Sequence, residues 1–228
     1  LIMLPPDYRR YISFSQKLRA IYDQYASRVE AFGLDECWLD VSNPGFTWAD
    51  GAKLALTLRQ RAVNELGLTL SVGVSWNKPY AKLGSDMKKP NATTLITPTN
   101  YQEQIFNLPA DKLIGIGRRT YPKLIKRGIN TIGDLARCEP EYMHRWLGKI
   151  GLILQCYAAG EDRTPVMSST ASRAVKSVGN SMTAPRDLVN MRDVHCMLYV
   201  LAESVGSRLR EIGLRGKCLS LSVRDENL

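Results

Sequence analysis

Histidine and paired cysteines are scarce in this sequence. Its 228 residues include two histidines, His144 and His195, and five scattered cysteines without a Cys-x-x-Cys pair. Structural zinc sites and disulfide frameworks need several such residues at short spacing, so neither is expected. The few histidines also argue against a histidine-based catalytic triad. The cysteines are Cys37, Cys138, Cys156, Cys196 and Cys218.

Long apolar runs and several common catalytic motifs are also missing. No stretch approaches the length that crosses a membrane, and the chain does not open on a secretory signal. We therefore expect a cytoplasmic protein without a membrane partner. The sequence has no Gly-x-x-x-x-Gly-Lys phosphate loop, no Gly-x-Ser-x-Gly elbow and no His-Glu-x-x-His motif.

Positive charge is abundant and unevenly distributed. Lysine and arginine number 31 against 22 acidic residues, a net charge of +9. The segment 112–133 contains six basic residues and no acidic residue before Gly133: Lys112, Arg118, Arg119, Lys123, Lys126 and Arg127. A basic cluster this local favours a polyanionic partner such as nucleic acid.

Two adjacent carboxylates, Asp35 and Glu36, interrupt an apolar stretch. We expect short strands at 28–32 and 37–42, joined by a turn at Gly33. Neighbouring strand residues point to opposite faces, so the two acids serve one site only at a turn or strand end. The pattern predicts an acidic hairpin tip able to bind a cation. A solvated acidic turn is the alternative.

The elements around the hairpin suggest a sheet covered by helices. Apolar periodicity predicts helices over about 7–26 and 47–66, the second with Ala52, Ala55, Leu58 and Ala62 inward, and a strand over 68–74. With one more strand in front, the order is β-α-β-β-α-β, the ferredoxin-like pattern of an antiparallel sheet with both helices on one face. That additional strand would place a third carboxylate near the pair.

A second candidate site follows on a predicted helix over about 77–89. Lys82, Asp86 and Lys89 recur at helical spacing and share one face, where lysines can hold a phosphate. The alternative is an exposed helix with Lys–Asp pairs on its surface.

Strand patterns disappear after Pro98, and short helical segments alternate with glycines. The segment 108–135 predicts a helix, a tight turn from Gly115 to Gly117, and further helices. Glycines let the backbone approach a ligand, and the next helix presents free amides to a DNA phosphate, independently of base sequence. Arg118, Arg119 and Lys123 strengthen the case for DNA binding. Otherwise this is an ordinary glycine turn between core helices.

The rest of the chain predicts further helices and a linker. Helices are expected at 140–148 and 149–160, then a small polar linker, a strand at 174–178, a helix at 193–212 and a strand at 217–225.

Several motifs, in the same order along the chain, resemble those of one enzyme family, the Y-family or translesion DNA polymerases. Residues 33–40 are similar to its Ser-Ile-Asp-Glu-Ala-Tyr-Leu-Asp signature, with Cys37 and Trp38 in place of Ala and Tyr. Residues 70–91 resemble its palm segment, the Gly-Ile-Gly hairpin its thumb, and Lys-Ser-Val-Gly at 176–179 the start of its little finger. Within UmuC/DinB-like enzymes, the UmuC-like branch is the closer resemblance.

The resemblance implies a fold and residue roles. The fold is α+β, with an incomplete ferredoxin-like palm at 1–98 (1–4 ending the fingers), an all-α helix-hairpin-helix thumb at 99–167, a linker at 168–174 and a partial little finger at 175–228. Asp35 and Glu36 would be catalytic and bind metal, two Mg²⁺ ions in the intact enzyme. Lys89, and less directly Lys82, would bind the incoming dNTP. Gly115 and Gly117, with Arg118, Arg119 and Lys123, would hold primer-template DNA.

The implied function is translesion synthesis during DNA damage tolerance and the SOS response, in the cytoplasm at the bacterial nucleoid, with a sliding clamp as a further partner. The family's first metal-binding Asp precedes the start of this chain, so we expect the 228-residue chain alone to be inactive. One alternative is a non-catalytic DNA-binding or accessory protein that retains the fold. A cyclase-like nucleotidyl enzyme is disfavoured, because it has no use for a duplex-binding hairpin.

Overall fold

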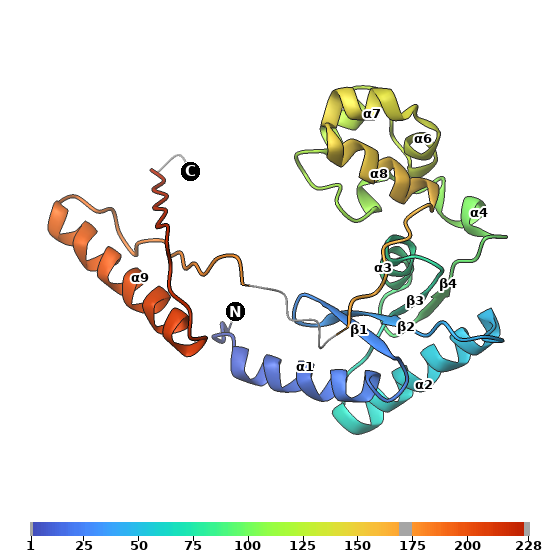
Figure 1. Ribbon diagram of the computed structural model, residues 1–228, viewed down its shortest axis with the longest axis horizontal. Coiled ribbons are helices and arrows are strands. Elements are labelled where there is room, and N and C mark those ends of the chain that lie inside the picture. The colour runs from blue at the N-terminus through green and yellow to red at the C-terminus, as the bar shows by residue number, and fades with distance from the viewer. Residues whose placement is uncertain (1, 169–174, 226–228) are drawn as a thin grey trace. The chain divides into compact units, whose positions relative to one another are not determined.

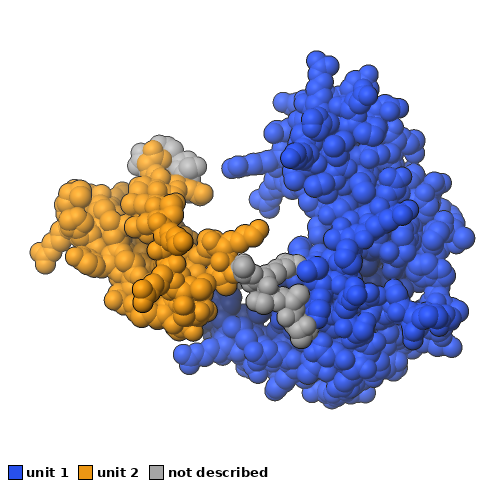
Figure 2. Space-filling model, in the orientation of Figure 1, with its two compact units in different colours: residues 1–171 blue, residues 172–228 orange. Residues whose placement is uncertain are grey.

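The computed structural model describes residues 2–168 and 175–225. The chain forms two compact units, residues 1–171 and 172–228 (Figure 2). The linker expected at 168–174 lies at this division, and all of it except Ser168 falls outside the described residues. Among the described helices, none combines the length and the apolar character needed to cross a membrane.

The first part of unit 1 contains the predicted helices and hairpin (Figure 1). Asp7 caps the first helix by accepting a hydrogen bond from Arg10, and Thr47 and Asp50 form a capping box on the second. Gly67 ends that helix in the left-handed conformation. The elements are α1 (Tyr8–Tyr22), β1 (Arg28–Phe32), β2 (Glu36–Asp40), α2 (Trp48–Leu66), β3 (Val72–Val74), α3 (Lys78–Met87) and β4 (Thr93–Leu95).

The expected single antiparallel sheet is not present in the described residues. They form two separate pairs, an antiparallel β1–β2 hairpin and a parallel β3–β4 pair. The strand predicted over 68–74 is confined to Val72–Val74, since only these residues have a pairing partner, and β4 was not predicted. The ferredoxin-like expectation required one further strand, and without it nothing in the described part of the chain bridges β2 and β3. The parallel pairing of β3 with β4 is the difference from the expected antiparallel arrangement.

Helices cover both faces of the β3–β4 pair. A Cβ added to Gly73 would meet α3, whereas one added to Gly51 of α2 would meet the side chain of Val74. Adjacent strand residues face opposite sides, so α2 and α3 lie on opposite faces, as Figure 1 shows. Gly51, rather than the predicted Ala52, is among the buried residues of α2 together with Ala55, Leu58 and Ala62.

Two hydrophobic cores stabilise unit 1. One lies between α1, α2 and the hairpin and includes Leu18, Tyr22 and Leu58. The other runs from Tyr80 of α3 through Ile105 to Leu154, so it joins α3 to the helices that follow. The side chains of Trp76 and Asn77 donate to the carbonyl of Gly160 at 2.9 and 3.1 Å, which fastens the chain after those helices to the start of α3.

The predicted helical region after residue 98 is confirmed, with one difference. The segment before the Gly-Ile-Gly turn is a three-residue 3₁₀ turn rather than a helix. Pro109 immediately before it and the turn directly after it leave no room for a longer helix. The elements are α4 (Tyr101–Ile105), η1 (Ala110–Lys112), α5 (Tyr121–Ile125), α6 (Ile132–Arg137), α7 (Pro140–Leu147) and α8 (Lys149–Ala159).

Unit 2 contains the predicted helix, α9 (Met191–Glu211), capped by Asn190. No residue of α9 is fully buried. The strand predicted over 174–178 is absent from its described residues, 175–178, and the one predicted over 217–225 does not form. Both predictions are wrong because a strand needs a paired neighbour, and the described part of unit 2 provides none.

Candidate active site

The hairpin tip carries the acidic pair, as predicted. Phe32 pairs with Glu36, the first residue of β2, and Gly33 takes a positive φ of 78° in the intervening turn. From α1, the Ser15 hydroxyl donates to the carbonyl of Leu34, and the Arg19 guanidinium donates to that of Gly33 at 3.4 Å. These contacts attach the turn to α1, so the backbone that bears the acidic pair is held in place.

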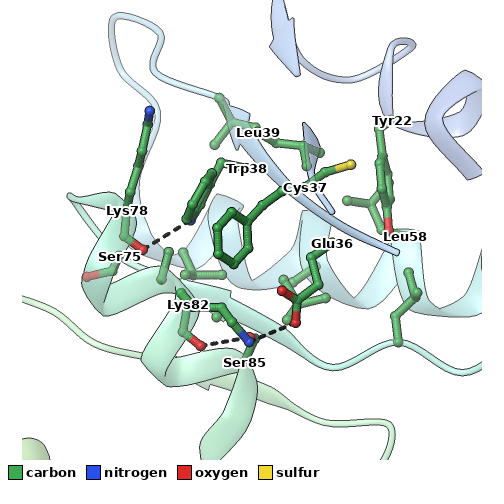
Figure 3. Close-up of a pocket in the computed structure, with 18 of the residues that line it drawn as sticks. Tyr22, Glu36, Cys37, Trp38, Leu39, Leu58, Ser75, Lys78, Lys82 and Ser85 are labelled. Atoms are coloured by element: carbon green, nitrogen blue, oxygen red, sulfur yellow. Dashed lines mark hydrogen bonds and ion pairs between the residues drawn. The ribbon is translucent and has the colours of Figure 1, made fainter. Parts of the chain in front are cut away.

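Asp35 and Glu36 both line one groove but differ in their surroundings. Asp35 is exposed and makes no hydrogen bond or ion pair with the described part of the chain, whereas Glu36 is half-buried. The Oε1 atom of Glu36 lies 2.8 Å from Nζ of Lys82, and Figure 3 shows the two side chains pointing toward one another. One carboxylate is therefore open to a ligand, and the other already holds a positive charge.

A chain of ion pairs continues from Glu36 along α3. Nζ of Lys82 also lies 2.6 Å from Oδ2 of Asp86, and the other Asp86 oxygen lies 2.7 Å from Nζ of Lys89. The structure thus brings together the acidic pair and both lysines predicted to bind the nucleotide. This connects a site on the hairpin with a site on α3 some fifty residues later.

The pairs change the proton affinity of their members. Desolvation of the Lys82 ammonium acts to lower its pKa, but hydrogen bonds to Asp86 and Glu36 outweigh it, so the pKa is raised. Desolvation acts to raise the pKa of Asp86, but hydrogen bonds from Lys82 and Lys89 outweigh it and lower that pKa. Both groups are charged near neutral pH.

A buried anchor holds α3 against the hairpin. The Trp38 indole donates to the carbonyl of Lys78 at 3.1 Å, and Nζ of Lys78 lies 2.5 Å from Oε2 of Glu30. The Lys78 ammonium also lies 5.3 Å from the centroid of the Trp38 ring. Sequence reasoning missed this anchor, because nothing in the separate segments indicated that Glu30 and Lys78 meet. The anchor at Lys78 places Lys82, one helical turn later, opposite Glu36.

The groove lies between two unpaired strand edges. Within the described residues β2 pairs only with β1 and β3 only with β4, so each keeps a free edge. The cavity has a volume of about 760 Å³, and it is lined by β2, the segment 68–76 and residues of α3. This volume leaves space for further protein or ligand between the hairpin and β3.

The donor set at this groove suits a hard divalent cation. Asp35 and Glu36 supply carboxylate oxygens, which Mg²⁺ prefers, and the Lys82 ammonium shows that Glu36 faces a position favourable to positive charge. Burial raises the pKa of the nearby Cys37 thiol, which disfavours the thiolate as a ligand. Asp40 at the far end of β2 caps a turn by accepting from the Ser42 amide at 3.0 Å. The described residues contain no group of three possible metal ligands.

The Gly-Ile-Gly turn presents open backbone. Gly115 has a φ of 92°, and a Cβ at Gly117 would meet nothing within 4 Å. Because α5 after the turn has only five residues, the expected contribution from its dipole is small. Lys82 and Asp86 line a hollow of about 440 Å³ together with this turn. The turn and the acidic groove therefore share Lys82 of α3 as a lining residue.

The basic residues around this turn remain available to a partner. Arg118, Arg119 and Lys123 are all exposed, as are Lys112, Lys126 and Arg127. Arg127 stacks on Trp146 with its guanidinium carbon 5.0 Å from the ring centroid. The predicted DNA-binding residues thus form an exposed basic surface beside the turn.

Comparison with known proteins identifies the family. The sequence model of the impB/mucB/samB family matches residues 1–86, and that of the C-terminal domain of the same family matches residues 175–228. The DNA polymerase IV of Acetivibrio thermocellus is 48% identical over 228 residues, which is all of this chain and 57% of the relative. The chain belongs to the Y-family DNA polymerases.

A second relative supports the assignment to this family. The DNA polymerase IV of Pelotomaculum thermopropionicum is 35% identical over 224 residues, 98% of this chain and 56% of the relative. This Y-family chain therefore spans a little more than half the length of these curated relatives. Both relatives are called DNA polymerase IV, so the resemblance to a UmuC-like branch gains no support from them.

Solved Y-family structures resemble most of the chain. A Y-family DNA polymerase chimera aligns with a TM-score of 0.80 at 26% identity, covering 91% of this chain and 60% of that one. DinB from Sulfolobus solfataricus aligns with a TM-score of 0.66 at 29% identity, covering 72% and 49%. An insertion ternary complex of Dbh DNA polymerase aligns with a TM-score of 0.68 at 26% identity, covering 91% and 60%.

Proposed function

We propose that the intact protein is a template-directed DNA polymerase that carries out translesion synthesis in the bacterial cytoplasm. The observation that carries this proposal is the convergence, in a Y-family chain, of the acidic pair with Lys82 and Lys89. Its substrates are primer-template DNA and dNTPs, and a sliding clamp is a further proposed partner. Residues 1–98 serve as palm, 99–167 as thumb and 175–228 as part of the little finger.

Each part of the site has a role in nucleotidyl transfer. Asp35 and Glu36 would hold divalent cations, Mg²⁺ in this proposal. Such ions, when bound, would lower the pKa of the attacking hydroxyl and stabilise the charge on the phosphoryl group that is transferred. Lys89 contacts the triphosphate, with Lys82 beside it, and the Gly-Ile-Gly turn holds the duplex through its phosphates. The backbone at Gly115 and Gly117 reads no base, so contact is independent of sequence.

A third carboxylate is proposed from residues outside this chain. The free edges of β2 and β3 face one groove, and a strand added there would hydrogen-bond to both. Such a strand would place an acidic side chain beside Asp35 and Glu36. This arrangement supports the expectation that the two carboxylates of the hairpin tip form an incomplete metal site.

The test of function compares the intact protein with this chain. We expect the intact protein to extend a primer in Mg²⁺ and the 228-residue chain to bind DNA without extending it. Robust extension by the chain alone would contradict the need for a third carboxylate. If the intact protein binds DNA with a steep salt dependence but never extends a primer, it is instead a non-catalytic DNA-binding protein.

Gly117→Ala tests the proposed contact between the turn and DNA. The added methyl meets nothing within 4 Å, so stability should not change, but it holds a phosphate away from the backbone. We expect duplex affinity to fall roughly three- to tenfold, the loss of about one hydrogen bond. Fluorescence anisotropy with two unrelated duplex sequences measures it. Unchanged affinity for both would remove the turn from the DNA site.

Arg118→Gln is the matched variant in the same experiment. It removes one exposed charge while leaving the backbone of the turn intact. The slope of log affinity against log salt is negative. We expect it to become less steep by about one in Arg118→Gln and to stay the same in Gly117→Ala.

A further inference from the structure

Asp86 joins the two lysines of the proposed nucleotide site. Each of its carboxylate oxygens contacts a different ammonium group, Oδ2 that of Lys82 at 2.6 Å and Oδ1 that of Lys89 at 2.7 Å. Lys82 lies within α3, whereas Lys89 follows the end of the helix at Met87. One side chain therefore sets the spacing between a lysine on a regular helix and a lysine on the segment after it.

The need for such a contact follows from the nature of lysine. A lysine side chain has four rotatable bonds, and holding it in one orientation costs up to about 2 kcal/mol of conformational entropy. The Lys89 side chain is 56% exposed, so little packing restrains it. Two ammonium groups at this separation also repel one another, and a shared carboxylate relieves that repulsion.

Asp86 also shares the Lys82 ammonium with Glu36, so Lys82 does not pair with Glu36 alone. Nζ of Lys82 lies between two acceptors, Oε1 of Glu36 at 2.8 Å and Oδ2 of Asp86 at 2.6 Å. Without Asp86, Glu36 would be the remaining carboxylate at this ammonium among the described residues. The lysine would then compete with any cation for Glu36 and turn away from the position of a phosphate.

We propose that Asp86 is a positioning residue for the incoming nucleotide, acting through Lys82 and Lys89. It contacts neither substrate nor metal in this role. Its carboxylate orders the two ammonium groups so that they meet the triphosphate together. The inference rests on the proposed polymerase function, because that function supplies the triphosphate substrate.

Net charge alone predicts the opposite effect of Asp86 on triphosphate binding from the one that positioning predicts. Asp86 is an anion beside a site for an anionic ligand, so its removal should strengthen triphosphate binding if only the net field matters. Positioning predicts that its removal weakens binding. The sign of the effect therefore separates the two explanations.

Asp86→Asn in the intact protein tests the proposal by steady-state kinetics at saturating Mg²⁺ and DNA. We expect the KM for dNTP to rise roughly three- to tenfold, the range available to two exposed ion pairs, with kcat changing much less. Asp86→Glu restores a carboxylate and should recover most of the loss. Glu65→Gln is the matched control, because it removes an exposed ion pair to Arg61 on α2 away from the groove.

The double variant Lys82→Gln, Lys89→Gln identifies the route of the effect. In that background Asp86→Asn should raise the KM no further, because both ammonium groups are gone. A further rise of the same size would overturn the proposal, since Asp86 would then act through other groups. A KM that falls on replacing Asp86 alone would overturn it in favour of the net field.

Binding of inorganic triphosphate to the 228-residue chain provides a test independent of catalysis. Calorimetry in metal-free buffer should show weaker binding by Asp86→Asn than by the unchanged chain or Glu65→Gln. Equal or tighter binding by Asp86→Asn would refute the positioning role. If the intact protein proves inactive while this difference is present, the polymerase proposal fails and the role of Asp86 in ordering the lysines stands.

Discussion

Replacing Asp35 or Glu36 by alanine in the intact protein should lower primer extension on the order of a thousandfold. Ions held by such carboxylates contribute several kcal/mol of charge stabilisation to the transition state, and each 1.36 kcal/mol is a factor of ten in rate. Asp35 is the exposed member and Glu36 the member paired with Lys82, so the two variants remove different ligands of one site.

Single-turnover extension with preformed enzyme–DNA complex is the appropriate measurement. Asp40→Asn is the control, because Asp40 lies at the other end of β2 and its oxygen caps Ser42, a role that asparagine can fill. DNA affinity should be retained in all three variants, which separates chemistry from binding. Extension at the normal rate by both alanine variants would refute the assignment of the acidic pair.

Gly73→Ala should produce the largest loss of stability among single methyl additions to the strands beside the groove. A Cβ at this position would lie 1.9 Å from the carbonyl oxygen of Ala81 and 2.6 Å from the amide nitrogen of Ser85. Both are backbone atoms of α3, so relief requires the helix to move away from β3. Overpacking of this kind costs about 3 kcal/mol.

Hydrogen exchange is the sharpest measurement of this effect, because it localises the loss. We expect amides of α3 and β3 to exchange faster in Gly73→Ala, while those of α7 and α8 keep their protection. Gly117→Ala is the matched control, since it adds the same methyl group in open space. Unchanged protection of α3 in Gly73→Ala would contradict the close contact between β3 and α3.

Local signals in the sequence were sufficient for most helices and for the hairpin. The caps Asp7, Thr47 and Asn77 and the αL glycine Gly67 each act within a few residues, so their effect can be recognised from short segments. Gly33 determined the turn in the same way, and with it the position of Asp35 and Glu36.

Contacts between distant segments could not be predicted in this way. β4 has three residues, and its existence depends on pairing with β3 across the intervening α3. Glu30 and Lys78 are 48 positions apart, and only the folded chain brings them together beneath Trp38. The spacing of Lys82, Asp86 and Lys89 indicated a common face, but their connection to Glu36 required the structure.

The free edge of β2 also bears on how the isolated chain behaves in solution. An unpaired edge can template β-aggregation by pairing with a second copy of itself. β2 has only five residues and carries a carboxylate at each end, Glu36 and Asp40. In an antiparallel pair of two such edges these like charges would face one another and oppose association. We therefore expect the carboxylates at the two ends of β2 to oppose self-association, less strongly at Glu36, where Lys82 offsets part of the charge.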